Sequence, residues 1–298
     1  MSLNHKPCFI VLLLIVFIAL LFSCSYSDTK PLSAPSVPMF NKIVVVIGEN
    51  EKPGSVVGDT SASYMNSILT DGVYFVNSFA IEHPSQPNYL DLISGSNQGI
   101  VDDELPPSHF TSSNLASELI NNGKKFVTYS EDLPFIGFDG PTSTLYARKH
   151  NPVANWVGSN TNQVSDGCSL SFKQFPTNFS MLPDVSFVIP NLCNDGHDLC
   201  APYFNRTKQF DVWIRNNLDK YRQWCRYNNS LLIITFDEDD SSGANKISTL
   251  FYGAKVARGI CVDSINHFRV LRTIEEAMRL SSHAGSSASS KPITSCWQ

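Results

Sequence analysis

The sequence predicts an α/β fold in which helices cover both faces of a mostly parallel sheet. Three short runs of apolar, largely β-branched residues each end abruptly in polar residues, as strands buried on both faces of a parallel sheet do. Segments with helical periodicity alternate with these runs, and no internal repeat or long linker interrupts them. We therefore expect one layered domain.

The clearest strands are residues 43–47, 186–189 and 231–236. Residues 125–129 and 248–252 have the same apolar character and are expected to form two further strands. Helical patterns lie between the strands, and Gly123 is a typical stop for one of them. The expected helices are 62–69, 88–94, 113–122, 210–221 and 267–280.

Length and composition are those of a globular protein. A chain of 298 residues with 42% hydrophobic and 16% charged side chains can bury a full core. The net charge of −5 argues against nucleic acid as a partner, because nucleic-acid binding normally requires a basic face. The sequence leaves the oligomeric state open.

The N-terminus has the pattern of a secretory signal peptide. Lys6 precedes an apolar run at residues 9–23, which small polar residues follow and which is short for a membrane span. We expect a protein that is secreted, or held at the cell surface or in the endomembrane lumen, with no stable membrane insertion after cleavage. An uncleaved signal anchor is the alternative. The expected division is a signal peptide at 1–25, a polar leader at 26–38, a main domain at 39–282 and a tail at 283–298. Residues 281–291 are expected to be loose unless Cys296 ties the end of the chain down.

Six of the eight cysteines follow the signal peptide, and in an exported chain this number suggests three disulfides. Cys193 and Cys200 are the expected pair, because they bracket a polar loop, and buried free thiols are the alternative for others. Sequons at Asn178, Asn205 and Asn228 predict solvent-facing glycosylation sites if the source is eukaryotic.

Polar side chains follow all three of the clearest strands. In open parallel sheets, ligands bind beyond the carboxyl ends of the strands, which meet at one edge. We therefore expect the following side chains to lie close together: Glu49, Asn50, Asn191, Asp195, His197, Asp237 and Glu238.

Several of these residues could hold a cation. Carboxylate and amide oxygens suit a hard divalent ion, and imidazole suits a transition ion. A doubled carboxylate at the end of an apolar strand would repel itself without a cation. The predicted ligands are Glu49, Asn50, Asp237 and Glu238, with His197 as a further candidate. The alternative for the acidic run 237–240 is a solvated turn.

The octapeptide 83–90, His-Pro-Ser-Gln-Pro-Asn-Tyr-Leu, places a hydroxyl at the mouth of a helix. Pro87 is compatible with a first helical turn, so the helix should begin at Gln86 or Pro87, with Ser85 at or next to the N-cap. A helix N-terminus also attracts phosphate. Ser85 is therefore a simple helix cap or a reactive group.

His150 and His197 lie beside amides and carboxylates in the sequence. An imidazole in such surroundings can donate a proton to a leaving group or bind a metal. A purely structural role is the alternative for each of them.

Six segments in this order resemble the phosphoesterase family of acid phosphatases and phospholipases C, from about Lys42 to Leu280. The family belongs to the alkaline phosphatase-like superfamily, so the resemblance implies a three-layer α/β/α sandwich and metal-assisted phosphoryl transfer. The segments are Gly48-Glu-Asn50, the octapeptide 83–90, Tyr146-x-x-Lys-His-Asn-Pro152, Pro190-Asn-Leu-Cys-Asn-Asp-Gly-His-Asp198, Thr235-Phe-Asp-Glu238 and His267-x-x-Val-Leu-Arg-Thr-Ile-Glu275.

The resemblance also implies roles for single residues. It makes Ser85 the nucleophile and assigns the metal to the four predicted ligands. Asn88 matches a position that contacts a phosphate oxygen, and His267 matches a histidine that supports the site. Positions near the phosphate, with leaving-group protonation or metal binding as candidate roles, match His150, Asp195 and His197.

The chain departs from the family pattern at Lys246, where many members have a histidine at what would be a second metal site in the wider superfamily. An ammonium group cannot replace a neutral imidazole ligand, but it can face a phosphate. We therefore expect one divalent ion per site and a substrate contact from Lys246. A plain surface lysine is the alternative, and weak or narrowed activity is a further possible consequence.

Together these observations predict a secreted, metal-dependent phosphomonoesterase of acid phosphatase type. It would hydrolyse phosphate esters through a phosphoserine at Ser85, with no organic cofactor. A phospholipase C or other phosphodiesterase is the alternative within enzymes, because the same nucleophile and metal cleave both kinds of ester. A secreted protein that binds phosphate esters without turnover is the alternative outside enzymes.

Overall fold

The computed structural model describes residues 1–2, 36–158 and 162–298. Its main sheet contains β1 (Lys42–Gly48), β2 (Val73–Phe79), β3 (Phe126–Ser130), β6 (Ser169–Ser171), β7 (Val185–Ile189), β8 (Ser230–Phe236), β9 (Lys246–Gly253) and β10 (Gly259–Asn266). The strand order is β10-β2-β9-β8-β1-β7-β3-β6. β9 is antiparallel to both of its neighbours, and the other pairs are parallel. The mostly parallel sheet is therefore confirmed.

The α-helices are α1 (Pro53–Val56), α2 (Ser63–Leu69), α3 (Ser85–Ser94), α4 (Leu115–Asn121), α5 (Arg206–Tyr227) and α6 (His267–Ala277). A small hairpin pairs β4 (Thr142–Ser143) with β5 (Tyr146–Ala147). Short 3₁₀ helices are η1 (Thr60–Ala62), η2 (Arg148–His150), η3 (Pro152–Asn155), η4 (Asp166–Cys168), η5 (Phe172–Gln174), η6 (Phe179–Met181) and η7 (Gly285–Ser289).

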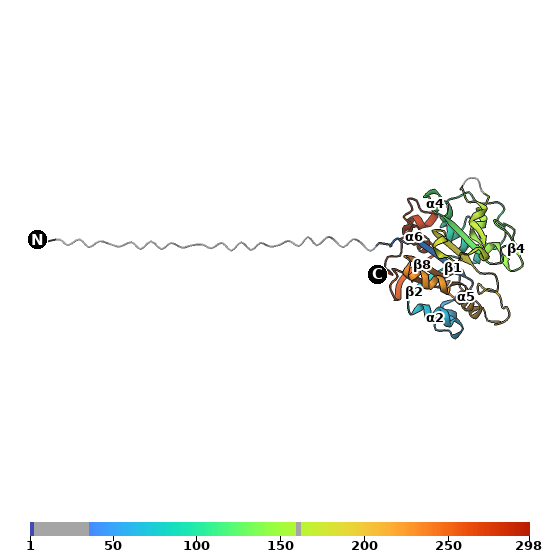
Figure 1. Cartoon of the computed structure of the whole chain (residues 1–298), viewed down its shortest axis with the longest axis horizontal. Helices are drawn as coiled ribbons and strands as arrows, with labels where there is room; N and C mark the ends of the chain where they lie inside the picture. Colours follow the sequence, from blue (N-terminus) through green and yellow to red (C-terminus); the bar gives the residue numbers. More distant parts are fainter. Residues whose placement is uncertain (3–35, 159–161) are drawn as a thin grey trace. The chain divides into compact units, whose positions relative to one another are not determined.

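Alternation along β1 explains the three layers. Ile43, Val45 and Ile47 pack into one core with residues of α3, α4 and α6. Val44 and Val46 point the other way and pack with residues of α2 and α5. Figure 1 shows α4 and α6 on one side of the sheet and α2 on the other. Because successive side chains of a strand point to opposite faces, an unbroken apolar run requires cover on both.

The five predicted strands all exist, but β2, β6 and β10 were not predicted. β10 lies at an edge of the sheet, leaves Ile260 and Val262 71% and 72% exposed, and is irregular between Cys261 and Ser264. It therefore lacks the continuous buried run by which the other strands were found. The helix predicted at 210–221 is longer than expected, because α5 covers Arg206–Tyr227.

Cysteine pairing agrees with the prediction in one case. Cys193 and Cys200 form a disulfide. The prediction of three disulfides is wrong within the described residues, because four further cysteines are buried free thiols: Cys168, Cys225, Cys261 and Cys296. Burial of the small, weakly polar thiol in a core explains their position without a bridge.

The N-terminal segments and the glycosylation sequons are described to different extents. The predicted signal peptide and most of the predicted leader lie outside the described residues. Among the helices of residues 36–158 and 162–298, none is long and apolar enough to cross a bilayer. Asn178 and Asn205 are exposed, and Asn228 is half-buried.

The C-terminal segment 283–298 is packed, which corrects the expectation of a loose tail. Gly95 ends α3 with φ 67°, and a Cβ there would lie 2.3 Å from the Ala284 carbonyl oxygen. The Glu275 carboxylate of α6 accepts hydrogen bonds from the Ala284 amide at 2.7 Å and the Ser287 hydroxyl at 2.6 Å. The segment therefore closes over α3 and α6.

This packing predicts a pH-dependent stability. Burial raises the pKa of Glu275 from its ordinary 4.5 to about 7. The folded protein therefore binds this proton more tightly than the unfolded chain, so the free energy of unfolding should fall as pH rises from about 4.5 through about 7. Glu275→Gln should remove about 3 kcal/mol of this pH dependence. Urea unfolding at several pH values measures it. Glu276→Gln, on the same helix, should keep the wild-type slope, and equal slopes for all three proteins would contradict the assignment.

Candidate active site

The polar segments after β1, β7 and β8 meet at one edge of the sheet, as predicted. β1 pairs with β7 on one side and with β8 on the other, in parallel register. The Glu49 amide donates to the Asp195 carbonyl at 2.8 Å, and the Asn50 amide donates to Asp237 Oδ1 at 3.1 Å. Hydrogen bonds from backbone amides thus join residues that are far apart in the sequence.

Ser85 lies at the centre of this edge. It is the first residue of α3 and is 2% exposed. Its hydroxyl lies 3.0 Å from Glu49 Oε2 and 3.1 Å from Glu238 Oε1, and its single proton can be donated to one of them at a time. The N-cap position is taken by Pro84, so the helix begins earlier than predicted. The hydroxyl therefore faces carboxylates and does not act as a cap.

Asn88 holds the loop that precedes Ser85. Its Oδ1 accepts hydrogen bonds from the amides of Ile81 and Glu82 at 3.0 and 3.1 Å. Its Nδ2 donates to the carbonyls of Glu82 and Pro84 at 2.7 and 3.1 Å. The predicted phosphate contact of Asn88 would require these bonds to break, because both halves of the amide are in use.

His150 lies buried between two carboxylates. Its Nε2 is 3.1 Å from Glu49 Oε1 and its Nδ1 is 3.2 Å from Asp195 Oδ2, while its ring stacks on Tyr89 with the centroids 5.3 Å apart. Burial, followed by the nearby charge of Lys149, lowers the pKa of His150 well below its ordinary value. A neutral imidazole has one N–H, so it cannot donate to both carboxylates.

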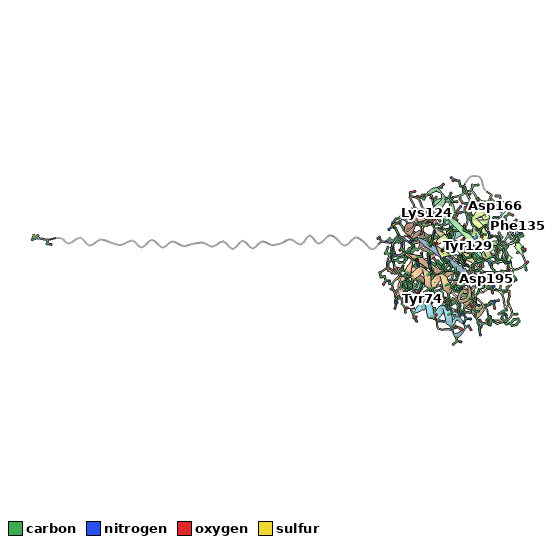
Figure 2. All side chains as sticks on the ribbon, viewed as in Figure 1. Tyr74, Lys124, Tyr129, Phe135, Asp166 and Asp195 are labelled. Carbon is green, nitrogen blue, oxygen red and sulfur yellow. A yellow bond between two sulfur atoms is a disulfide. The ribbon has the colours of Figure 1, made fainter. Side chains whose placement is uncertain are left out.

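Asp195 is fully buried, and its label in Figure 2 marks its place in the domain. Its Oδ1 accepts the amide of His197 at 2.8 Å. Burial raises the pKa of Asp195 to about 8. These contacts position the two histidines, whereas the sequence predicted a contact between Asp195 and the substrate.

The carboxylates around Ser85 repel one another. Burial, together with the charges of Asp237 and Asp195, raises the pKa of Glu49 well above its ordinary value. Burial and the charge of Glu238 raise the pKa of Asp237 to about 8. Asp237 Oδ2 is buried without a hydrogen-bond donor, and Glu49 Oε1 and Asp195 Oδ2 face only the ring nitrogens of His150. Such a cluster requires protons or a cation to offset its charge.

The carboxylate oxygens around Ser85 are chemically suited to bind a hard divalent cation. Unpartnered carboxylate oxygens are the ligands that such ions prefer. Across residues 36–158 and 162–298, however, no three His, Cys, Asp or Glu side chains are gathered into a formed metal cage. The side chains of the four predicted ligands would therefore have to turn toward a common point.

The acidic run is not the solvated turn that was considered for it. Asp237, Glu238 and Asp239 are buried, and only Asp240 is on the surface, where it forms an ion pair with Lys52 at 2.7 Å. The first three residues of the run thus stay buried, as the strand before them is.

Two histidines hold the buried part of the run. His83 Nδ1 contacts the Glu238 carboxylate, and its Nε2 lies 3.5 Å from Asp239 Oδ1. His267 Nε2 donates to the Asp237 carbonyl at 2.7 Å. His83 was overlooked as a site residue, although it stands in the octapeptide with Ser85.

Lys246 contacts β2. Its ammonium lies 3.4 Å from Asn77 Oδ1 and 5.9 Å from the centroid of the Phe79 ring. The reason is the antiparallel register of β9, which places Lys246 opposite Phe79. These contacts give no support to the predicted substrate contact.

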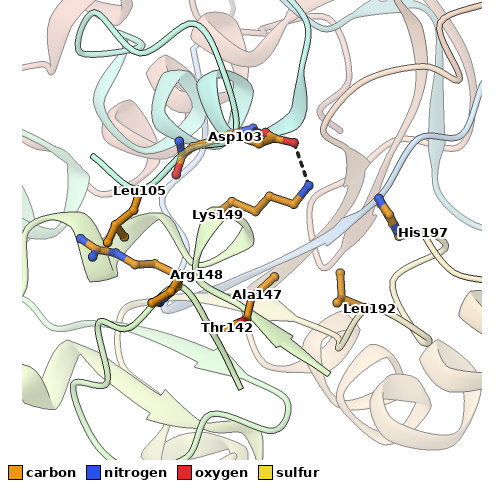
Figure 3. A pocket seen from close by; sticks show the side chains of 10 residues that line it. Asp103, Leu105, Thr142, Ala147, Arg148, Lys149, Leu192 and His197 are labelled. Carbon is orange, nitrogen blue, oxygen red and sulfur yellow. Dashed lines mark hydrogen bonds and ion pairs between the residues drawn. The ribbon is translucent and has the colours of Figure 1, made fainter. Parts of the chain in front are cut away.

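A pocket of about 260 Å³ opens beside the start of α3 (Figure 3). Lys149 reaches Asp103 within it, with Nζ 2.8 Å from Oδ2. His197 also lines it, and its Nδ1 is 2.8 Å from Asp198 Oδ1. Apolar walls come from Leu105, Pro141, Ala147 and Leu192. The sequence assigned no role to Lys149 or Asp103, because the two lie 46 residues apart and only the fold pairs them.

Residues 58–281 match the model of the Phosphoesterase family. A phosphatidylinositol-3-phosphatase of Mycobacterium tuberculosis is 39% identical over 268 residues, which are 89% of this chain and 86% of that protein. A probable acid phosphatase of Kluyveromyces lactis is 27% identical over 251 residues, or 79% of this chain, and the chain spans only 58% of its length.

Solved structures show the same fold. A protein in the alkaline phosphatase superfamily from Vibrio parahaemolyticus superposes with a TM-score of 0.60 at 13% identity, covering 87% of this chain and 72% of that one. With the sheet order and the layers, this likeness confirms the α/β prediction. The chain is thus a member of the Phosphoesterase family with an alkaline phosphatase-like α/β fold, and it is a phosphoric ester hydrolase.

Proposed function

We propose that the protein is a metal-dependent phosphomonoesterase with Ser85 as its nucleophile. The observation that carries the proposal is the Ser85 hydroxyl, 3.0 and 3.1 Å from two carboxylates at the N-terminus of α3. A serine hydroxyl is a weak nucleophile until a neighbouring group takes its proton. The first turn of a helix leaves amides without partners inside the helix, and such amides favour a negative phosphoryl group.

One divalent ion would be held by Glu49, Asn50, Asp237 and Glu238. When bound, it would supply the positive charge that lowers the pKa of the serine hydroxyl and offsets the charge of the phosphoryl group. The buried Oδ2 of Asp237, which has no hydrogen-bond donor, supports this assignment. His267 and the Asn50 amide hold Asp237 in place from two sides.

Phosphoryl transfer then proceeds in two steps. Ser85 Oγ gives its proton to the Glu49 or Glu238 carboxylate and bonds to phosphorus as the ester P–O bond breaks, and the leaving alkoxide takes a proton from His197. Water next gives a proton to His197 as its oxygen bonds to phosphorus and the bond from phosphorus to Ser85 Oγ breaks. Phosphate leaves, and Ser85 takes its proton back from the carboxylate. His197 suits the first proton transfer because it lines the pocket, with its side chain 35% exposed and Asp198 at its other face. His150 and Asn88 act as positioning residues for Glu49 and for the Ser85 loop.

The pocket suggests a compact alcohol as the leaving group. Its apolar walls and its size of about 260 Å³ fit a ring-sized group better than a long chain. The name of the Mycobacterium tuberculosis relative points to a phosphoinositide monoester, and we propose this substrate class here. The Cys193–Cys200 disulfide supports the further proposal of an exported protein with a cleaved signal peptide at 1–25.

Paired substrates test the proposed function. Purified protein should hydrolyse p-nitrophenyl phosphate and phosphatidylinositol 3-phosphate, with kcat/KM at least about tenfold above that for bis-p-nitrophenyl phosphate. EDTA should abolish turnover, and a divalent ion should restore it. A diester preference would favour the phosphodiesterase alternative. No turnover of any ester after metal repletion would favour a binding protein.

A further inference from the structure

Asp103 occupies two hydrogen-bond donors beside the nucleophile. Its Oδ1 accepts the amide of Gln86 at 3.0 Å, and its Oδ2 accepts from Lys149 Nζ at 2.8 Å. Gln86 follows Ser85 as the second residue of α3, so its amide is one of those that an α-helix leaves unpaired. Figure 3 shows Lys149 crossing the pocket to reach the carboxylate.

The same two donors suit a phosphoryl group attached at Ser85. The amide is adjacent to the nucleophile in the chain. Lys149 directly precedes His150, whose Nε2 lies 3.1 Å from Glu49 Oε1, and Lys149 and Gln86 line the same pocket. Charge-assisted bonds from an amide and an ammonium are typical of phosphate recognition.

Access to Ser85 requires a movement. With Ser85 2% exposed, a covering group must move before phosphorus can approach its hydroxyl. The side chain of Asp103 is 34% exposed, so it borders solvent. The backbone around it is fixed, because Gln86 Nε2 donates to the carbonyls of Asp102 and Glu104 at 3.1 and 2.7 Å. A rotation of one side chain is therefore sufficient to release both donors.

We propose that Asp103 occupies a phosphoryl-oxygen subsite formed by the Gln86 amide and the Lys149 ammonium, and that a substrate phosphoryl group displaces it. The inference rests on the proposed function and adds a reason why the enzyme would select monoesters over diesters by their charge. A monoester dianion competes with a resident carboxylate for an ammonium group better than a diester monoanion does. Asp103 is thus a specificity-determining residue that favours monoesters.

Calorimetric titration with inorganic phosphate tests this without turnover. Asp103→Asn keeps an acceptor for the Gln86 amide but loses the charge that holds Lys149, so it should bind phosphate roughly three- to tenfold more tightly than wild type. Lys149→Met should weaken phosphate binding, and the double variant should lose the gain. Asp102→Asn, on the exposed neighbour, is the matched control and should bind as wild type does.

Kinetics supply the second readout. Asp103→Asn should lower KM for p-nitrophenyl phosphate and reduce the preference for this monoester over bis-p-nitrophenyl phosphate. Unchanged or weaker phosphate binding in a folded Asp103→Asn protein would overturn the proposal and leave Asp103 as a helix cap. Tighter phosphate binding in proteins that hydrolyse no ester would instead retain the subsite and overturn the phosphatase.

Discussion

Replacing Ser85 with alanine should lower kcat for a phosphate monoester by about a thousandfold or more. The variant lacks the oxygen that bonds to phosphorus, and neither Glu49 nor Glu238 is replaced. Because the lost hydroxyl donates a hydrogen bond to a buried carboxylate, the melting temperature should fall modestly while the protein stays folded. Steady-state assays and thermal unfolding measure the two effects.

Ser108→Ala is the matched control for this variant. Ser108 is an exposed serine in a loop and should tolerate the change with wild-type activity. Full activity in Ser85→Ala would show that another group attacks phosphorus.

Asp237→Asn should have opposite effects on activity and stability. Loss of one metal-binding carboxylate should lower kcat by about a hundredfold or more. In EDTA, however, the variant should unfold at a higher temperature than wild type, because an amide removes one of several buried charges that repel one another.

The sign of the pH effect follows from the pKa of Asp237, which is raised from 3.8 to about 8. A raised carboxyl pKa means that stability falls as pH rises from about 4 through about 8, so the variant's advantage should be largest above pH 8. Divalent ions should raise the melting temperature of wild type and not that of Asp237→Asn. Asp240→Asn, in the same acidic run but on the surface, is the control and should follow wild type in activity and metal response. A variant that is less stable than wild type in EDTA would contradict the account of charge repulsion.

The layered fold could be predicted because burial on both faces leaves a simple pattern. β1 and β8 carry unbroken apolar runs, and their neighbouring positions bring Glu49 and Asp237 together. β10 could not be found in this way, because an edge strand that exposes Ile260 and Val262 has no such pattern.

The site was only partly predictable for a related reason. A serine at the start of a helix has the same sequence pattern whether it caps the helix or attacks a substrate. The distinction depends on Glu49 and Glu238, which lie 36 and 153 residues away and reach Ser85 only in the fold. Lys149 and Asp103 likewise become partners only when the loop carrying Asp103 closes against the start of α3.

For two of the predicted substrate contacts, the structure shows other partners for the side chain. Asn88 stands at the expected place on α3, but the backbone of the preceding loop uses both halves of its amide. Lys246 stands at the expected place on β9, but the register of that strand directs its contacts to Asn77 and Phe79. The motifs therefore predicted the place of each residue on its helix or strand better than they predicted the partner of its side chain.

The central claim is that Ser85 forms a covalent phosphoryl intermediate. Mass spectrometry of protein that is acid-quenched during turnover of p-nitrophenyl phosphate measures this directly. The account predicts one added phosphoryl group on the peptide that contains Ser85, and none in Ser85→Ala. Phosphate on another residue, or active protein that carries none at any quench time, would contradict it.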